Sequence, residues 1–582
     1  MTQHALTQTI PTYLKTFIAK QDPSLYTQMD HASWRFILKL SEDFFSHHAH
    51  QKYLSGLIET GISKERIPLI SEMDQCLKKF NWRAVPVTGF IPPAAFMEFL
   101  SLGILPIACD MRKLEHLAYT PAPDIVHEAA GHAPILADPE YADYLRSYGE
   151  ISQKAIFSSQ DMEVYQAIRH LSDTKEDPTS TDEMILLAQS NLDQAVAHQT
   201  YESEATLLAR MGWWTFEYGM VGDLTRPKIY GAGLLSSLGE SYHCFDGDVK
   251  KIPFSIDCIE KTYDITRPQP QLFVSPDFQS LKEALGELAN RMAFRRGGIE
   301  GLQKALQAGT VTTCMLDTGV QVSGKLTRFI QDDLGCPCYL QYQGPTQLSY
   351  QYSEIPGQDA TYHKEGFGTS LARITELQLS QAGLSIGGGR GLLELESGVS
   401  IEGKLENSLS QEGHLILLTF ADCTVKKGSE ILFRPEWGKY DLICGREVVS
   451  VFGGAADRTR YLEAVGGFHQ ESGRMKTNLT EANRELNRLY GKVRQLREAA
   501  RWDQLASAQL EEVYGELEKK YPDDWLLRIE LLELNLQFHL KLPWENVLRK
   551  RLNEIAKQTS EKNEMIQRGL RLLEKVGDLN VG

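Results

Sequence analysis

The sequence predicts a multidomain protein with a mainly α-helical first half, a β-rich middle region with an internal repeat, and an α-helical C-terminal region. A chain of 582 residues, 42% hydrophobic and 24% charged, has room for several globular domains. From about residue 310 to 454, short runs of β-branched residues alternate with glycines, which is typical of antiparallel strands. After Thr480, apolar residues recur at helical spacing. We therefore expect domains at 1–305, 306–460 and 461–582.

The first half is predicted to be built on helices. Residues 31–49 carry apolar side chains on roughly one side, which predicts a scaffold helix: Trp34, Ile37, Leu38 and Phe45. Residues 83–93 alternate between apolar and polar and then reach Gly89 and two prolines, so a short strand should enter a loop. Residues 168–196 are predicted to form polar helices around a loop. A final helix should close this half near residue 298.

Two segments of the middle region are alike. L-D-T-G-V-Q-V-S-G-K-L starts at Leu316, and L-E-S-G-V-S-I-E-G-K-L starts at Leu395. Each predicts a strand, a turn and a second strand, so we expect two small barrels or sandwich halves in tandem. The run I-G-G-G-R-G at 386–391 is followed by a strand-like segment. It is therefore predicted to be a turn, because a phosphate-binding loop should open a helix.

The C-terminal region is predicted to be helical and to mediate interactions. Apolar residues spaced by three and four indicate the seam of a helix pair or short coiled coil: Leu479, Ala482, Leu486, Leu489, Val493 and Leu496. Further helices should follow Ala499 and Pro522. We expect their charged faces to be solvated, and the region to support a homo-oligomer.

Charge and cysteine usage limit the partners and the compartment. The net charge of -16 argues against binding of nucleic acid or an anionic membrane, because both favour a basic surface. The nine cysteines are scattered and odd in number, which indicates reduced thiols in the cytoplasm. The N-terminal residues lack a signal-peptide pattern, and no run of 18 apolar residues occurs. We expect a cytoplasmic protein.

Two histidines five positions apart predict a metal site. On an unbroken α-helix, His127 and His132 would point about 140° apart. Gly131 and Pro134 are helix-stopping residues, so we expect the helix to end between the histidines and both rings to reach one ion. A zinc hydrolase would instead need H-E-x-x-H, with the second histidine one position earlier.

The third ligand is predicted to be a carboxylate. Two imidazoles and a carboxylate with open positions suit a non-haem Fe(II) that activates O₂. Glu217 is the only acid in the apolar, aromatic run M-G-W-W-T-F-E-Y-G-M, and a metal would compensate its burial. The alternative from spacing alone is that His127 and His132 are hydrogen-bonded core residues and Glu217 pairs with an arginine.

Three motifs in order carry a family resemblance. P-D-I-V-H-E-A-A-G-H-A-P, W-W-T-F-E-Y-G and Y-G-A-G-L-L-S-S-L-G-E resemble the pterin-dependent aromatic amino acid hydroxylases, the bacterial phenylalanine 4-monooxygenases in particular. The resemblance runs from about Tyr26 to about Gly298 and implies this family's catalytic domain for the first half. It implies that His127, His132 and Glu217 hold the iron. It does not extend to the second half.

The resemblance also implies the residues that bind the substrate and the pterin. Arg112 would grip the amino acid carboxylate through its bidentate fork. The other substrate-binding residues would be Thr120, Pro123, Trp213 and Ser236. Phe96 would stack on the pterin ring, a contact that suits a flat heteroaromatic. The other pterin-binding residues would be Phe90, Ile91 and Glu128.

Some positions near this pocket are ambiguous or depart from the family pattern. Asp124 has the character of a helix N-cap, and Glu240 that of an acid behind the metal ligands. Ala122 and Gly212 replace the glutamate and the aromatic residue that family members commonly carry, so two parts of the pocket wall differ. The segment between His132 and Glu217 is also longer than the resemblance implies.

The resemblance implies a monooxygenase that uses O₂, Fe(II) and tetrahydrobiopterin or another tetrahydropterin. The expected reaction converts L-phenylalanine to L-tyrosine, as in phenylalanine catabolism. Tryptophan or tyrosine hydroxylation, or a catalytically silent amino acid-binding protein, are the alternatives. All predicted site residues lie before Glu240, so we expect a chain that ends near residue 305 to stay soluble and active. We expect it to differ from the full chain in oligomeric state or substrate response.

Overall fold

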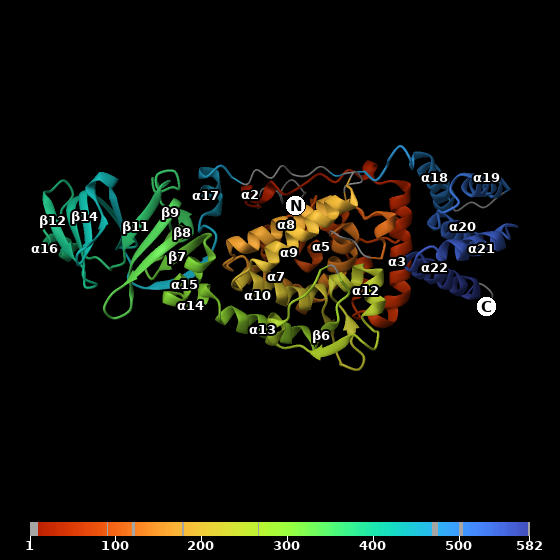
Figure 1. Ribbon diagram of the computed structural model, residues 1–582, viewed down its shortest axis with the longest axis horizontal. Coiled ribbons are helices and arrows are strands. Elements are labelled where there is room, and N and C mark those ends of the chain that lie inside the picture. Colours follow the sequence, from red (N-terminus) through yellow and green to blue (C-terminus); the bar gives the residue numbers. More distant parts are fainter. Residues whose placement is uncertain are drawn as a thin grey trace. The chain divides into compact units, whose positions relative to one another are not determined.

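The computed structural model describes residues 10–89, 91–118, 123–176, 180–265, 267–467, 475, 477–499 and 504–579 (Figure 1). The chain forms two compact units. One contains Met1–Thr16, Tyr148–Ala209 and Glu283–Gln470, and the other contains Phe17–Ser147, Arg210–Lys282 and Glu471–Gly582. The C-terminal region thus shares a unit with most of the first half. The boundaries at 305 and 460 stay a prediction.

Helix α3 (Gln28–His48) is a helix of 21 residues in the second unit. A capping box starts it: Thr27 Oγ1 accepts from the Asp30 N–H, and the Asp30 carboxylate accepts from the Thr27 N–H. The predicted apolar face is buried, and so are Arg35 and Phe36. The predicted scaffold helix is confirmed, but it is buried on more than one side.

Two small sheets accompany the helices of this unit. Strands β1 (Arg83–Val87) and β2 (Ile104–Ala108) pair in parallel, and α6 (Pro93–Ser101) connects them. The predicted strand at 83 is confirmed. A four-stranded sheet has the order β4-β3-β6-β5: β4 (Lys228–Ile229), β3 (Met220–Val221), β6 (Gln271–Ser275) and β5 (Lys250–Pro253). Other helices are α4 (Tyr53–Glu59), α5 (Ile70–Leu77), α11 (Ala232–Ser236) and α12 (Leu238–His243).

The predicted C-terminal helices are confirmed. They are α18 (Arg484–Ala499), α19 (Gln504–Lys520), α20 (Leu526–Gln537), α21 (Glu545–Ala556) and α22 (Ser560–Leu579). Helices α18, α20 and α22, drawn in blue, contact the red helix α3 (Figure 1). Leu489, Val493 and Leu496 of the predicted seam are buried within this one chain. The expectation that the charged faces are solvated is wrong for Glu530, which is 3% exposed.

The first unit contains the predicted extra helices and the β-rich region. Helices α8 (Ser159–Glu176) and α9 (Asp182–Ala197) pack together. Other helices of this unit are α2 (Thr12–Lys15), α14 (Ala293–Arg296), α15 (Gly298–Ala308), α16 (Glu376–Gln381) and α17 (Arg458–Ala464). Helices α7 (Pro139–Ser152), α10 (Glu204–Gly212) and α13 (Phe278–Asn290) complete the first half.

In the described part of the chain, no helix is both long and apolar enough to cross a membrane.

Two antiparallel sheets form the middle region, as predicted. One has the order β10-β9-β8-β7-β17 with β11 on β9: β7 (Val311–Leu316), β8 (Val320–Gln331), β9 (Pro337–Tyr350), β10 (Ser353–Glu354), β11 (Gly366–Ser370) and β17 (Val448–Gly453). The other has the order β12-β13-β14-β15 with β16 on β14: β12 (Arg390–Glu394), β13 (Val399–Gln411), β14 (His414–Lys427), β15 (Glu430–Phe433) and β16 (Tyr440–Ile443). The predicted turn at 386–391 is confirmed only in its first part, because Arg390 and Gly391 already belong to β12.

The two similar sequence segments lie in similar hairpins. Each crosses a turn at a glycine with positive φ, 84° at Gly319 and 78° at Gly398, where a side chain would be strained. The pairing of β8 with β9 shifts register after Ser323, Leu326 and Ile330. The pairing of β13 with β14 shifts after Glu402, Leu405 and Leu409. These shifts fall at corresponding positions of the two segments.

Candidate metal centre and its surroundings

The two motif histidines lie on one π-helix, η4 (Val126–His132). In a π-helix the hydrogen bonds join residues five apart, so those residues lie on one side of the helix. The ring centroids of His127 and His132 are 4.9 Å apart, and the ring planes meet at 88°. The prediction that the helix ends between the histidines is therefore wrong, because a wider helical turn brings the rings together. A 3-10 helix, η5 (Ala133–Ala137), follows directly.

Glu217 faces both histidines from a second π-helix, η6 (Trp213–Glu217). Its Oε1 lies 3.2 Å from His132 Nε2, and its Oε2 lies 3.4 Å from His127 Nε2. Ligands that share one ion, with bonds of about 2.0–2.2 Å each, have separations of this size. His132 Nε2 is buried beside the Glu217 carboxylate. These three side chains could hold one metal ion.

The electrostatics of the cluster suit metal binding. Burial lowers the pKa of His127 to about 4, so at neutral pH its imidazole is in the uncharged form that binds metals. Burial acts to raise the pKa of Glu217, but His132 and His127 outweigh it and hold the pKa below its ordinary value. Burial acts to lower the pKa of His132, but the Glu217 charge outweighs it, and the net shift is upward. A metal ion at His132 would therefore compete with a proton for the ring nitrogen.

Glu128 is a second acid beside the histidines. Ligand atoms of His127, Glu128 and His132 lie within 4.8 Å of one another. However, Glu128 Oε2 is 4.0 Å from His132 Nε2, farther than either oxygen of Glu217 is from its histidine. Burial raises the pKa of Glu128 to about 8, so it is mostly a neutral acid at pH 7. Glu217 is therefore the better third ligand.

Ser236, at the end of α11, orients the first histidine. Its Oγ is 3.0 Å from His127 Nδ1 in a hydrogen bond. A partner on Nδ1 fixes the ring so that Nε2 faces Glu217. Helix α11 comes close to both π-helices because glycines line the contacts. A Cβ at Gly131 would lie 2.8 Å from the Ala232 carbonyl oxygen, and one at Gly231 would lie 2.4 Å from that of Glu217. Gly131 and Gly231 thus allow these backbones to lie close together.

Arg112 is buried and held by Asp124. Its Nε and Nη2 each donate to the Asp124 carboxylate at 2.8 Å, and its Nη1 donates to the Ser236 carbonyl oxygen at 2.9 Å. A guanidinium has five N–H donors, and described residues accept from three of those of Arg112. Asp124 also accepts from the His127 N–H at 3.0 Å. The expected cap residue thus also positions Arg112, which local sequence does not reveal.

Trp213 lies in an aromatic stack. Its ring is stacked on Tyr218 at 4.4 Å and on Tyr263 at 4.3 Å, and its Nε1 donates to Gln269 Oε1. Neither tyrosine was predicted. Glu240, expected behind the metal ligands, accepts instead from the Gln269 N–H, so it supports the partner of Trp213.

The candidate pterin residues are only partly brought together. Phe96 on α6 is half-buried, with its ring centroid 6.4 Å from that of His132. Ile91 is buried, and Pro123, a predicted substrate residue, is exposed. Phe90 and Thr120 lie outside the described residues. The structure therefore places Phe96 beside the ligand cluster and connects Arg112 to that cluster through Ser236.

Comparison with known proteins points to one family. A sequence model described as biopterin-dependent aromatic amino acid hydroxylase matches residues 18–168 and 190–297. The interruption lies within the extra helices α8 and α9. The phenylalanine-4-hydroxylase of Ralstonia nicotianae is 30% identical over 309 residues, covering 50% of this chain and 83% of that protein. The enzyme of Chromobacterium violaceum is 27% identical over 307 residues, covering 50% and 88%.

Solved structures give matches over a similar span. Chromobacterium violaceum phenylalanine hydroxylase with bound iron(III) and oxidised cofactor 7,8-dihydrobiopterin matches with 25% identity and a TM-score of 0.38, covering 47% of this chain and 86% of that chain. Its structure with bound iron and phenylalanine matches with 23% identity and a TM-score of 0.36, covering 50% and 91%.

Proposed function

Because the chain belongs to the biopterin-dependent aromatic amino acid hydroxylases, we propose that it is a monooxygenase that hydroxylates the ring of an aromatic amino acid. We propose L-phenylalanine as the substrate and L-tyrosine as the product, in phenylalanine catabolism. The similarity to two phenylalanine-4-hydroxylases supports this choice. Tryptophan or tyrosine hydroxylation, and amino acid binding without turnover, are the alternatives.

The observation that carries this proposal is the convergence of His127, His132 and Glu217 from two π-helices. Two imidazoles and one carboxylate suit non-haem Fe(II) with open positions for other ligands. When bound, Fe(II) and a tetrahydropterin would supply the activation of O₂. A related enzyme solved with iron and dihydrobiopterin supports these cofactors.

The residues of the chain would bind and orient the reactants. Arg112, fixed by Asp124, would receive the substrate carboxylate, and Ser236 would hold the His127 ring. Trp213, within its tyrosine stack, would line the pocket for the aromatic ring. Thr120 and Pro123 complete the proposed substrate residues.

The pterin would lie against Phe96 and Glu128. Phe96 offers a ring face for stacking, and Glu128, mostly protonated at pH 7, can donate a hydrogen bond to a pterin heteroatom. Phe90 and Ile91 would form the rest of its wall. Water would be excluded by the buried surroundings of Glu128 and His132.

Two proposals concern the chain as a whole. We infer that the β-rich region is a tandem repeat, and the corresponding register shifts of the β8–β9 and β13–β14 pairs support it. We also propose a reducing compartment such as the cytoplasm, in line with nine free cysteine thiols.

The test of the function is a coupled assay on the full chain. Purified protein with Fe(II) and a reduced pterin is given phenylalanine, tyrosine or tryptophan, and both hydroxylated product and oxidised pterin are measured. Tyrosine formed from phenylalanine in step with pterin oxidation is expected, and Glu217→Ala should abolish it. Iron-loaded, folded protein that hydroxylates none of the three amino acids would contradict the proposal.

A further inference from the structure

Helix α22 of the C-terminal region contacts the catalytic segments through Arg568. The Arg568 side chain is 5% exposed. Its Nη1 donates to the Leu238 carbonyl oxygen, and its Cζ lies 3.5 Å from the centroid of the Tyr242 ring. Leu238 and Tyr242 both belong to α12. A buried guanidinium with a hydrogen bond and a cation–π contact holds that helix at two points.

Helix α12 starts two residues after Ser236, which contacts the candidate metal centre. Ser236 hydrogen-bonds to the His127 ring, and its carbonyl oxygen accepts from Arg112. Ser237 follows, and its hydroxyl caps the Glu240 N–H while donating to a backbone carbonyl oxygen. A displacement of Leu238 would therefore move Ser236, and with it the contacts to both His127 and Arg112.

A second C-terminal side chain holds the other segment of the pocket. Asn478 Nδ2 donates to the Met111 carbonyl oxygen at 3.1 Å and to Asp30 Oδ1 at 2.8 Å. Met111 immediately precedes Arg112 in the chain. Asn478 thus holds the backbone just before Arg112. Arg568 holds the segment whose Ser236 carbonyl oxygen accepts from the Arg112 guanidinium. Both of these residues lie after position 470.

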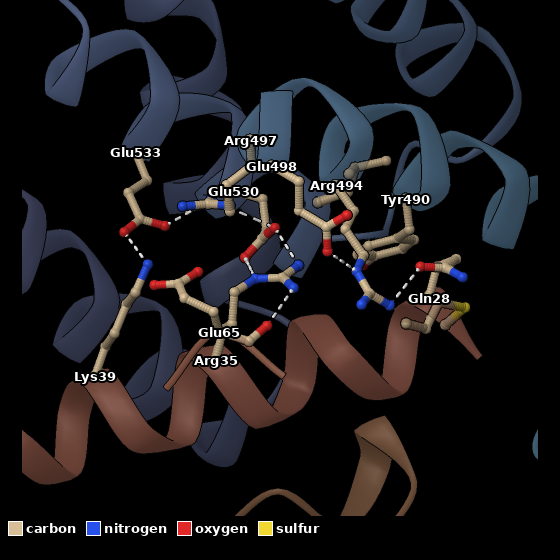
Figure 2. Close-up of polar contacts among 12 residues, drawn as sticks. Gln28, Arg35, Lys39, Glu65, Tyr490, Arg494, Arg497, Glu498, Glu530 and Glu533 are labelled. Carbon is tan, nitrogen blue, oxygen red and sulfur yellow. Dashed lines mark hydrogen bonds and ion pairs between the residues drawn. The ribbon is translucent and has the colours of Figure 1, made fainter. Parts of the chain in front are cut away.

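Buried ion pairs join the C-terminal helices, which carry these two contacts, to helix α3. Figure 2 shows Arg35 of α3 in a bidentate ion pair with Glu530 of α20, with exposed side-chain fractions of 1% and 4%. Arg497 also contacts Glu530, at 3.5 Å, and both Arg497 and Lys39 pair with Glu533 (Figure 2). Separating buried, paired charges is strongly unfavourable. The C-terminal helices are therefore fixed on α3 rather than loosely attached.

Close packing of α22 on α3 also fixes the position of the backbone next to Arg568. Gly569, the next residue, lies so near α3 that a Cβ there would be 2.9 Å from Phe36 Cε2. The Phe36 ring in turn meets the Trp525 ring edge-on at 5.1 Å. The backbone beside Arg568 therefore has little freedom to shift.

We propose that Arg568 and Asn478 are positioning residues for the hydroxylase pocket, so that the C-terminal helices of this chain complete the site. Arg568 sets Ser236 and the His127 ring, and Asn478 sets the backbone of Arg112. The kinetic consequences rest on the proposed function, but the structural ones do not. This replaces the expectation that a chain ending near residue 305 would stay soluble and active.

Hydrogen exchange on the full chain tests the structural part. We expect residues 231–243 to exchange about tenfold faster in Arg568→Gln, because a charge-assisted hydrogen bond and a cation–π contact are lost. Arg571→Gln is the matched control, because Arg571 lies on the same helix and is exposed. Its exchange should equal that of the wild type. Asn478→Ala should speed exchange in the segment around Met111 instead.

Kinetics test the effect on the pocket. Arg568→Gln should raise the KM for the amino acid about tenfold with little change in the KM for pterin, since pterin is proposed to lie elsewhere. Arg568→Ala opens space next to a cavity of about 610 Å³, lined in part by Tyr242 and Glu564. Added guanidinium should therefore restore the KM of Arg568→Ala, whereas the same concentration of sodium chloride should not.

Each outcome gives a decision. Folded Arg568→Gln with wild-type exchange at 231–243 and a wild-type KM would overturn the proposal for Arg568. If that variant does not fold, Asn478→Ala decides, and wild-type exchange around Met111 would overturn the shared role of the C-terminal region. If the wild type does not hydroxylate at all, the proposed function fails, while the exchange results still judge the positioning contacts separately.

Discussion

Arg35 and Glu530, 495 positions apart in the chain, form a buried bidentate ion pair in which Arg35 Nη2 lies 2.7 Å from Glu530 Oε2 and Arg35 Nε lies 3.1 Å from Oε1. The pair joins a helix of the first half to the C-terminal helices. Replacing one partner leaves a charge without compensation in a buried place, whereas replacing both removes the pair and leaves Arg497 with Glu533 as its partner. The contact between α3 and the C-terminal helices can therefore be tested by measuring the free energy of unfolding of variants at Arg35 and Glu530.

Glu530→Gln should lower the free energy of unfolding of the compact unit that contains α3 and the C-terminal helices by about 3–5 kcal/mol. The reason is that the buried guanidinium of Arg35 loses its charged partner. Urea unfolding followed by near-UV circular dichroism measures the change. Glu42→Gln is the control on the same helix α3, since its ion pair with Lys64 is exposed and should contribute about 0–1 kcal/mol. The double variant Arg35→Met with Glu530→Leu should recover most of the loss. Equal stability of Glu530→Gln and the wild type would contradict a buried pair.

Stability should also depend on acid pH through Glu530. Burial acts to raise its pKa, but Arg497 and Arg35 outweigh this and hold it well below its ordinary value of 4.5. The stabilisation is therefore complete above pH 4.5 and is lost as the pH falls below that value towards the folded-state pKa. The difference in melting temperature between the wild type and Glu530→Gln should shrink as the pH drops below 4.5. A difference that does not change with pH would argue against the lowered pKa.

Metal content should distinguish the two candidate acids. Glu217→Ala and His132→Ala should lose bound iron, whereas Glu128→Gln should keep it, because only Glu217 contacts both histidines. Ser236→Ala should weaken iron binding about 10–100-fold, as expected when the partner of a ligating histidine is removed. Elemental analysis after gel filtration measures this without any assay of turnover. Iron loss in Glu128→Gln with full retention in Glu217→Ala would reverse the assignment.

Arg112→Lys should raise the KM for the amino acid at least about tenfold, because an ammonium cannot replace a fork that already binds Asp124 on one edge. The KM for pterin should change little. Steady-state kinetics with each substrate varied in turn measures both. The proposed substrate contact is wrong if amino acid kinetics stay unchanged in a folded Arg112→Lys enzyme.

A chain that ends near residue 305 should be unstable, which is the opposite of what the sequence predicts. Such a chain lacks Glu530, and it exposes the face of α3 that carries Arg35 and Phe36. Expression of both lengths, with gel filtration and thermal unfolding, tests this. A soluble, monomeric and iron-binding short chain would show that the C-terminal helices are dispensable for folding.

The sequence predicted the candidate site well where short motifs contain the ligand residues themselves. The motifs with His127, His132 and Glu217 predict a cluster that the structure brings together, and Ser236 of the third motif hydrogen-bonds to the first histidine. The local geometry was less predictable. A five-residue spacing does not fit one face of an α-helix, and the residues around Gly131 do not distinguish a helix end from the wider turn of a π-helix.

Contacts between distant segments were not predictable from one sequence. Glu530 and Arg497 have the pattern of ordinary charged helix residues, so they were expected in solvent. Only the fold shows that they face Arg35 and one another. Asp124 is similar: its place before a helix predicts a cap, but its bond to the Arg112 fork depends on how the chain after β2 turns back.

The capping of α3 by a late residue bears on how the protein is made. Asn487 Oδ1 accepts from the N–H groups of Gln28 and Met29 at the start of that helix, and Arg35 needs Glu530. At about 5–20 residues per second, ribosomes need roughly 25–100 s to add the residues between Arg35 and Glu530. During this time the nascent first half holds a cation and an apolar helix face without their partners. Synthesis should therefore leave it dependent on chaperones until the last helices emerge.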